Sequence, residues 1–475
     1  MRFYTQEDLC LEQVGVDVWR IGLTKTATRP NGVTSSWNYE DKRNLLIQVQ
    51  NGSVSDFGYT NNAIGNRTAM SRAGSAFAAP DTISYSYNSR SEVIGAVSNQ
   101  NSAYNYAYSF DPIGNRLTAN LAGTSYNYTT NMLNQYTVIN SNQPTYDDDG
   151  NMLTNGSWTY TWNGENRMIQ AVNGNTKLQL VYDYMGRRIE KKVFDGDTVV
   201  SHKRFVYDNY KQVEELDALN SNSVLKRYSW QPEAVGLDVP LSMTDVATAK
   251  NYAYTLDANK NASDLTDALG NVVAHYEYSP FGTHTATGSY TGNPFRFSSE
   301  FFDSETGLFY YNYRYYNPKL GRWISKDPLQ EKGGINLYNF VLNTPANTFD
   351  IKGNEVVCMS IVIGVSAWTI ISKVAIATSA LITTYIITEV AKETIQDYKY
   401  KACACVAVGA AYIVTKTRTR TETEHKDPPD PCDAIRAACK AACWEKVQKL
   451  KTTNRQPPFR RCVHNCLEAA GCSSL

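Results

Sequence analysis

Pairs of aromatic residues separated by one residue recur along the first three quarters of the chain, often at intervals close to twenty residues. In an extended strand, positions i and i+2 point to the same face, so each pair places two rings on one side. The pairs are Trp37/Tyr39, Phe57/Tyr59, Tyr85/Tyr87, Tyr106/Tyr108, Tyr126/Tyr128, Tyr160/Trp162, Tyr182/Tyr184 and Tyr276/Tyr278. The recurrence predicts many similar strands, each with an aromatic face to bury.

Many of these pairs lead into a polar turn such as Gly65-Asn66, Gly114-Asn115, Gly150-Asn151 or Gly270-Asn271. Gly and Asn accept the positive φ angle that tight turns need, so each unit predicts a strand, a turn and a returning strand. One unit cannot bury its aromatic face alone, whereas stacked units can. We therefore expect a mainly β fold, built as a long, spiralling antiparallel sheet. The alternative is an ordinary β-sandwich rich in tyrosine, which does not explain why turn and pair recur together.

The length and charge of the chain narrow the function further. A chain of 475 residues exceeds what one hydrophobic core usually supports, so two or more units are expected. The 46 basic and 46 acidic residues cancel, which is not the charge balance of a general nucleic-acid binder. We expect no nucleic-acid partner and no cofactor. The first twenty residues lack a basic region followed by an apolar run. We therefore expect either a non-classical or dedicated export route, or a reading frame that begins in the middle of a longer ancestral protein.

The unit Tyr-x-Tyr-[Asp/Asn]-x-x-Gly-Asn-[Arg/Leu] resembles the YD repeat of the Rhs family, whose teneurin-like members share the YD shell. Residues 293–353 resemble the Rhs-associated core, through Asn293-Pro294-Phe295-Arg296-Phe297, Glu305-Thr306-Gly307-Leu308-Phe309-Tyr310-Tyr311, Arg314-Tyr315-Tyr316-Asn317-Pro318, Gly321-Arg322-Trp323 and Lys326-Asp327-Pro328. The resemblance implies a repeat shell over residues 1–292, closed by a core over residues 293–353. In the family, such a shell encloses a variable C-terminal toxin.

The resemblance also implies a self-cleavage site of the aspartyl type, since Rhs-type cores commonly end in Asp-Pro-x-Gly and are cut just after it. Two carboxylates in a poorly solvated site can share a proton and activate water. Asp327 and Asp350 match the two carboxylates, and Arg322 could orient them. The expected cut lies one or two residues after Gly353. Ile351 replaces the usual proline, and the alternative is that both aspartates only cap turns.

The C-terminal part differs sharply in composition, because nine of the ten cysteines lie in the last 122 residues. Residues 354–426 are expected to form a hydrophobic helical segment followed by an amphipathic strand. The apolar run 356–388 is long enough to cross a bilayer, but it carries Lys373 near its middle. It is either a pore-forming or translocation helix or a buried helix of a globular domain. Threonines and charges alternate from Thr415 to Glu424, which indicates the strand.

Residues 427–475 predict a cysteine-rich α-hairpin. In an antiparallel hairpin, facing residues have nearly constant summed numbers, and three nested disulfides satisfy this rule: Cys432 with Cys472, Cys439 with Cys466 and Cys443 with Cys462. A unit this small needs such staples, which implies an oxidising location. A zinc site is the alternative, although it would leave two cysteines unused, and we expect no metal. No catalytic motif is apparent in this module.

These observations predict a polymorphic-toxin carrier whose shell stores and delivers its own C-terminal module. Expected partners are that module, an immunity protein and a target-cell membrane. We expect a secreted or cell-surface location. The alternatives are a non-toxic surface or extracellular YD-repeat protein anchored by its hydrophobic segment, and a displaced tip of a longer protein that no longer functions.

Overall fold

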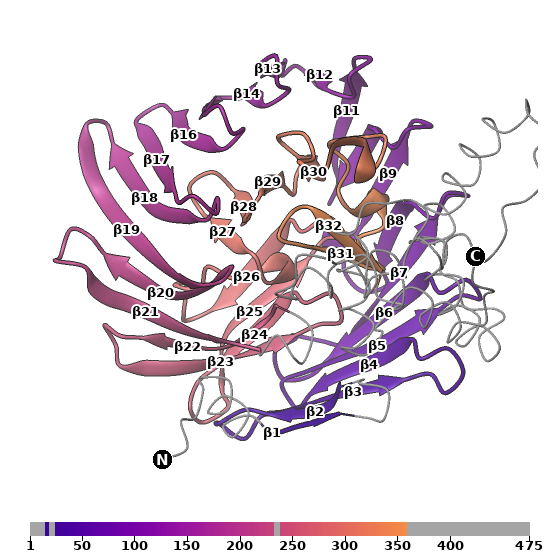
Figure 1. Ribbon diagram of the computed structural model, residues 1–475. Helices are drawn as coiled ribbons and strands as arrows, with labels where there is room; N and C mark the ends of the chain where they lie inside the picture. Colours follow the sequence, from indigo (N-terminus) through magenta and orange to yellow (C-terminus); the bar gives the residue numbers. More distant parts are fainter. Residues whose placement is uncertain (1–14, 19–23, 232–237, 359–475) are drawn as a thin grey trace, which may run out of the picture. The chain divides into compact units, whose positions relative to one another are not determined.

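The computed structural model describes residues 15–18, 24–231 and 238–358. In this part of the chain nearly all regular structure is antiparallel β, and strands follow one another in sequence order (Figure 1). The first sheet has 12 strands: β1 (Gly15–Val18), β2 (Thr24–Thr28), β3 (Thr34–Tyr39), β4 (Leu46–Asn51), β5 (Ser55–Asn61), β6 (Arg67–Ala73), β7 (Asp81–Tyr87), β8 (Val93–Ser98), β9 (Tyr106–Phe110), β10 (Arg116–Leu121), β11 (Thr124–Thr130) and β12 (Tyr136–Ile139).

The second sheet has 14 strands: β13 (Thr145–Tyr146), β14 (Met152–Asn155), β15 (Trp158–Trp162), β16 (Met168–Asn173), β17 (Thr176–Tyr182), β18 (Arg188–Asp195), β19 (Thr198–Asp208), β20 (Lys211–Asp217), β21 (Ser223–Trp230), β22 (Pro240–Asp245), β23 (Lys250–Leu256), β24 (Ala262–Thr266), β25 (Val272–Tyr278) and β26 (His284–Gly288). The expected antiparallel fold is confirmed, but the repeats form two sheets where one was predicted. Only an isolated bridge, Ile139 to Asn142, lies between β12 and β13. Pro144 follows it, and proline has no N–H to continue a ladder.

The repeated turn explains the polar residue found at or shortly after most of the aromatic pairs. At Asp111, carboxylate oxygen Oδ1 accepts the backbone N–H groups of Ile113 and Asn115, at 3.0 and 2.8 Å. Gly114 then takes the left-handed conformation, with a φ of +88°. The same side-chain cap recurs at Asn62, Asn88, Asn131, Asn163, Asp183, Asp257 and Asp267. Each unit therefore carries its own turn signal, independent of its neighbours.

Residues 293–358 pack between the two sheets (Figure 1). Their strands are β27 (Phe301–Asp303), β28 (Leu308–Tyr311), β29 (Arg314–Asn317) and β30 (Arg322–Trp323) in one small sheet, with β31 (Thr348–Ile351) and β32 (Glu355–Cys358) in a hairpin. The short 3-10 helices η1 (Ser102–Tyr104), η3 (Phe297–Ser299), η4 (Gln330–Lys332) and η5 (Val341–Asn343) complete the described elements. Within the described residues, no helix has the length and apolar character to cross a bilayer.

Aromatic rings of the second sheet meet rings of this core segment. Tyr228 of β21 packs edge-on against Phe295 at 4.9 Å, and Phe205 of β19 packs against Phe301 at 5.6 Å. Polar contacts accompany them, since Tyr338 Oη donates to the Gly150 carbonyl at 2.7 Å. Edge-to-face ring pairs add about 0.5–1.5 kcal/mol each beyond the area they bury. The core segment therefore supplies a surface against which repeats of the second sheet bury aromatic rings.

The start of the described hydrophobic segment departs from the helix that was predicted for residues 354–426. Residues Glu355–Cys358 form β32, because their backbone pairs with β31 in the register Asp350 to Val356. The rest of that segment and the cysteine hairpin over residues 427–475 lie outside the described residues.

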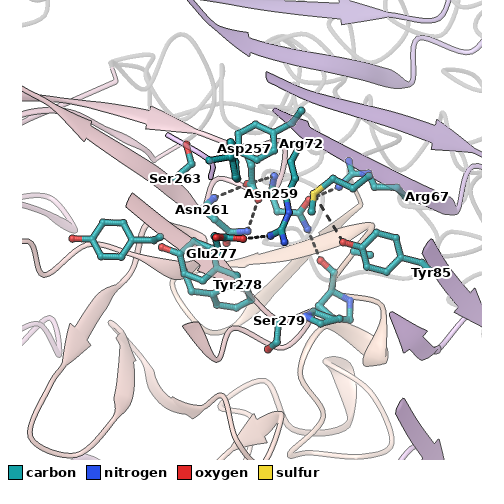
Figure 2. Close-up of a pocket in the computed structure, with 18 residues that line it drawn as sticks. Arg67, Arg72, Tyr85, Asp257, Asn259, Asn261, Ser263, Glu277, Tyr278 and Ser279 are labelled. Atoms are coloured by element: carbon teal, nitrogen blue, oxygen red, sulfur yellow. Dashed lines mark hydrogen bonds and ion pairs between the residues drawn. The ribbon is translucent and has the colours of Figure 1, made fainter. Parts of the chain in front are cut away.

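A buried ionic cluster joins the two sheets beside a small cavity of about 50 Å³. Figure 2 shows Arg67 and Arg72 from β6 reaching toward Asp257, Asn259 and Glu277 of the second sheet. Arg72 forms ion pairs with Asp81, at 2.8 Å, and with Glu277. This cluster ties β6 to β25.

The neighbouring pair of Asp264 and His275 predicts a dependence of stability on pH. His275 Nδ1 lies 2.6 Å from Asp264 Oδ1, and Ser55 of the first sheet donates to Asp264 Oδ2 at 2.8 Å. Burial disfavours the imidazolium, but hydrogen bonds to Asp264 and Glu277 raise the pKa of His275 to about 9. Because this pKa lies above the unfolded value of about 6.5, the stabilisation is complete below about pH 6.5 and is lost as pH rises through about 9.

The measurement is urea unfolding of the wild type and of His275→Gln between about pH 6 and about pH 10. The difference in unfolding free energy is expected to reach about 3 kcal/mol at the acidic end and to shrink toward the alkaline end. Every other titrating group is common to both proteins, so its contribution to the pH dependence cancels in the difference between them. A difference that stays constant with pH would contradict the assigned ion pair.

A candidate self-cleavage site at the end of the core

Asp350 lies in β31 with its side chain fully buried, just before the hairpin turn into β32. Its Oδ1 atom accepts the backbone N–H groups of Gly353, at 2.9 Å, and of Asn354, at 3.1 Å. Both donors stabilise the carboxylate form. Asp350 therefore holds the peptide that follows Gly353 directly against its own carboxylate.

Arg314, at the start of β29, connects the two aspartates that the sequence singled out. Its Nη1 atom lies 2.9 Å from Asp327 Oδ2, and its Nη2 atom lies 3.5 Å from Asp350 Oδ2. Its Nε atom donates to the carbonyl oxygen of Gly353. The guanidinium is buried and stacks on Trp323 at 4.1 Å. Burial lowers the pKa of Arg314, while the charges of Asp327 and Asp350 oppose that shift and hold the cation in place.

The two predicted carboxylates thus face one guanidinium, and each also caps a turn. Asp327 Oδ1 accepts the N–H of Leu329 at 2.8 Å, as Asp350 Oδ1 accepts those at its own turn. In each aspartate, Oδ1 caps the turn and Oδ2 faces Arg314. The turn-capping alternative and the paired-carboxylate prediction are therefore compatible, because they concern different oxygens. With Arg314 between them, however, the aspartates are arranged as two anions around a cation.

The structure places Arg322 elsewhere. Its Nη2 atom donates to the carbonyl of Asn134 at 2.8 Å and to Asn115 Oδ1 at 3.3 Å, and its guanidinium covers the Tyr136 ring at 3.9 Å. It thus fastens β30 to the turns around β10 and β12. The arginine at the carboxylates is Arg314, which sequence reasoning missed. A single charge inside the aromatic run from Phe309 to Tyr316 was the available signal.

Gly353 fits this site because it has no side chain. Its φ is +84°, and a Cβ atom there would lie 2.8 Å from the Tyr311 carbonyl oxygen and 2.9 Å from Tyr311 Cβ. The hairpin turn therefore sits directly on the end of β28, and Tyr313 N donates to the Lys352 carbonyl at 3.0 Å. These contacts fix the Gly353 carbonyl against Arg314.

Other predicted site residues are not described. The six hairpin cysteines, Cys432, Cys439, Cys443, Cys462, Cys466 and Cys472, lie outside the described residues, so their pairing stays a prediction. Within the described ranges, no group of three or more His, Cys, Asp or Glu side chains is arranged to hold a metal ion.

Comparison with known proteins identifies the family to which this architecture belongs. A family model described as the teneurin YD-shell matches residues 36–346, which is more than half of the chain. The chain is 30% identical over 263 residues to the tRNA nuclease WapA of Bacillus subtilis strain 168, covering 52% of this chain and 11% of that protein. It is also 30% identical over 232 residues to the double-stranded DNA deaminase toxin A of Burkholderia cenocepacia strain H111, covering 42% and 16%.

Among solved structures, the fold is similar to a chain of the Photorhabdus luminescens Tc holotoxin pore, with a TM-score of 0.60 at 19% identity, covering 74% of this chain and 20% of that chain. The chain thus spans between a tenth and a fifth of the length of these proteins. The matched family model, the tandem turn-capped hairpins and the core segment agree. The chain belongs to the teneurin YD-shell family of Rhs-type YD-repeat proteins.

Proposed function

We propose that this chain is the carrier part of an Rhs-type toxin, in which the repeat shell and core hold a variable C-terminal module for delivery. The relatives reported above are named as a nuclease and as a deaminase toxin, which are different activities. A segment common to both is better suited to carrying an effector than to either reaction. In this chain the module begins after Gly353, where the family-like core ends.

We further propose that the chain cuts itself beside Gly353 by hydrolysis. The supporting observation is the convergence of charged groups on one peptide: Arg314 Nε on the Gly353 carbonyl, and Asp350 Oδ1 on the Asn354 N–H. A cation at the carbonyl oxygen stabilises the charge that develops there, and a carboxylate at the nitrogen can exchange protons with the leaving amine. We place the proposed cut at the Gly353–Asn354 bond, because these contacts lie on its carbonyl oxygen and its N–H.

The roles of the C-terminal module are also proposals. Its nested cysteine pairs would stabilise a small hairpin in an oxidising environment outside the cytosol. The apolar run would act at a target membrane, and an immunity protein would protect the producing cell. These roles agree with the toxin names of the relatives. A gene for an immunity protein directly downstream of this one would support these roles.

The test of self-cleavage is the intact mass and fragment pattern of the purified full chain, beside Asp350→Asn. The wild type is expected to give two fragments that meet between Gly353 and Asn354, and the variant to stay uncut, because it loses the carboxylate. Circular dichroism of both proteins serves as the folding control. A single uncut chain in both would remove self-cleavage from the proposal and favour the anchored surface protein.

A further inference from the structure

Arginine recurs at one place in the repeat, as the first residue of the strand that follows a capped turn. Arg67 begins β6, Arg116 begins β10 and Arg188 begins β18, and all three side chains are buried. Burial removes the water that stabilises a guanidinium, so a buried arginine normally has an anion beside it. Arg188 pairs with Asp303 at 2.5 Å. Burial raises the pKa of Asp257, and the charge of the neighbouring Arg67 opposes that shift.

Arg116 differs from these two equivalents, because no ion pair links it to any of the described residues. The one side-chain hydrogen bond that it makes there runs from Nη1 to the Lys319 carbonyl oxygen, at 3.2 Å. Its Nε and Nη2 atoms have no hydrogen-bond partner within the same ranges. These two nitrogens form one edge of the guanidinium, and such an edge donates two parallel hydrogen bonds when it binds an anion. The edge of Arg116 that suits an anion is therefore unused by the described protein groups.

Aromatic rings and neutral hydroxyl groups surround the Arg116 guanidinium. Its Cζ atom lies 4.5 Å from the centre of the Phe281 ring and 4.7 Å from that of Tyr108. The Oη atoms of Tyr108 and Tyr128 are also buried and lack hydrogen-bond partners in the part of the chain that the structure describes. Burial raises the pKa of both tyrosines, and the charge of Arg116 opposes that shift. Both hydroxyls therefore keep their protons, and the surroundings of Arg116 combine positive charge with unused donors.

We infer that Arg116 binds a small monovalent anion, such as chloride, along its Nε–Nη2 edge, with the hydroxyls of Tyr108 and Tyr128 as further donors. A buried polar group without a partner commonly marks a bound water or ion. A water molecule would leave the charge of the guanidinium uncompensated, whereas an anion supplies both the missing charge and the missing acceptor.

The position of Arg116 gives this anion a structural role. Arg116 belongs to the first sheet, Phe281 to the turn between β25 and β26 of the second sheet, and Lys319 to the core segment. The guanidinium lies directly on the backbone of the core at Gly321, where a Cβ atom would collide with Nη2. An anion bound here would therefore help to hold both sheets against the core segment.

The experiment measures urea unfolding of the full chain while sodium bromide replaces sodium gluconate at constant ionic strength. Bromide is the probe because it carries the same charge as chloride and can be located by anomalous X-ray scattering. The constant ionic strength keeps the screening of other charges the same throughout. Since only the folded chain has the site, the unfolding equilibrium constant is expected to fall about tenfold for each tenfold rise in bromide above the dissociation constant.

Three variants test the assignment of the site. Arg116→Met removes the charge and is expected to abolish the bromide dependence. Tyr128→Phe keeps the ring but removes one donor, and is expected to weaken bromide binding about tenfold, as for the loss of one hydrogen bond to a charged group. Arg29→Met is the matched control and should respond as the wild type does. Arg29 is also buried, but its Nε and Nη1 atoms already donate to the Tyr254 carbonyl and to Ser35 Oγ, at 3.0 and 2.6 Å.

Two results would overturn the anion site. A wild type whose stability does not depend on bromide would mean that only water meets the guanidinium. An equal dependence in the wild type and in Arg116→Met would mean that bromide acts on the protein in general. If Arg116→Met does not fold, Tyr128→Phe and wild-type crystals grown in bromide decide the question. An anomalous peak beside Arg116 Nε supports the site, and an ordered Arg116 without such a peak contradicts it.

Discussion

Asp303→Ala is expected to reduce the free energy of unfolding by about 3–5 kcal/mol, because it leaves two buried cations without their counter-ion. Asp303 Oδ2 lies 2.5 Å from Arg188 Nη1, and Asp303 Oδ1 lies 2.6 Å from Lys191 Nζ. Arg188 and Asp303 are 1% exposed at the side chain. Although burial opposes it, the charges of Arg188 and Lys191 lower the pKa of Asp303, as expected for a carboxylate that is fully paired. This cluster ties β18 to the core segment at β27.

Two comparisons test the explanation. Glu214→Ala removes a partly exposed carboxylate, paired with Arg227 at 3.0 Å, and is expected to cost less than about 1 kcal/mol. The triple change Arg188→Met, Lys191→Met and Asp303→Leu removes all three charges and is expected to recover most of the lost stability. Urea unfolding of the full chain measures each effect. A triple variant as unstable as Asp303→Ala would show that packing, rather than stranded charge, causes the loss.

Gly353→Ala is expected to slow self-cleavage by about 10²-fold, since displacements near 1 Å at a reacting bond have effects of that size. The added Cβ would meet the Tyr311 carbonyl oxygen at 2.8 Å and Arg314 N at 3.3 Å, both of which are backbone atoms. The turn must therefore move, and the Gly353 carbonyl moves with it relative to Arg314. Fragment formation after refolding, followed on gels, measures the rate.

Gly307→Ala is the matched control for this change. Gly307 has a φ of +71° in the same core segment, but a Cβ atom there meets nothing within 4 Å. It therefore carries the conformational cost of about 1–2 kcal/mol without the steric contact. Its cleavage rate is expected to match the wild type. Equal slowing in both variants would trace the effect to general destabilisation instead of to the position of the scissile peptide.

The repeat architecture could be predicted because its signals are local. An aromatic pair such as Tyr106/Tyr108 and the capping residue Asp111 lie within six residues of each other, so strand, turn and burial follow from short-range rules. The break between β12 and β13 depends on Pro144, which is also local and could have been noticed. Turn chemistry of this kind does not depend on where the strand lies in the sheet.

The candidate site was predictable only in part, because its geometry depends on packing between distant segments. Asp327 and Asp350 were named from a resemblance to a family motif, and the structure brings both to Arg314. Choosing Arg314 over Arg322 required knowledge of which face of the small sheet meets the β31–β32 hairpin.

The pairing of β31 with β32 bears on timing. Hydrolysis at Gly353 would leave Glu355–Cys358 still hydrogen-bonded, residue by residue, to Thr348–Ile351. Hydrolysis of the peptide bond and separation of the two fragments would then be two successive steps, each with its own barrier. The barrier of the second step is the opening of the four-residue pairing between β31 and β32. In the proposed carrier, the cut module would therefore stay attached until the pairing of β32 with β31 opens, and any force or unfolding that separates this one strand would release it.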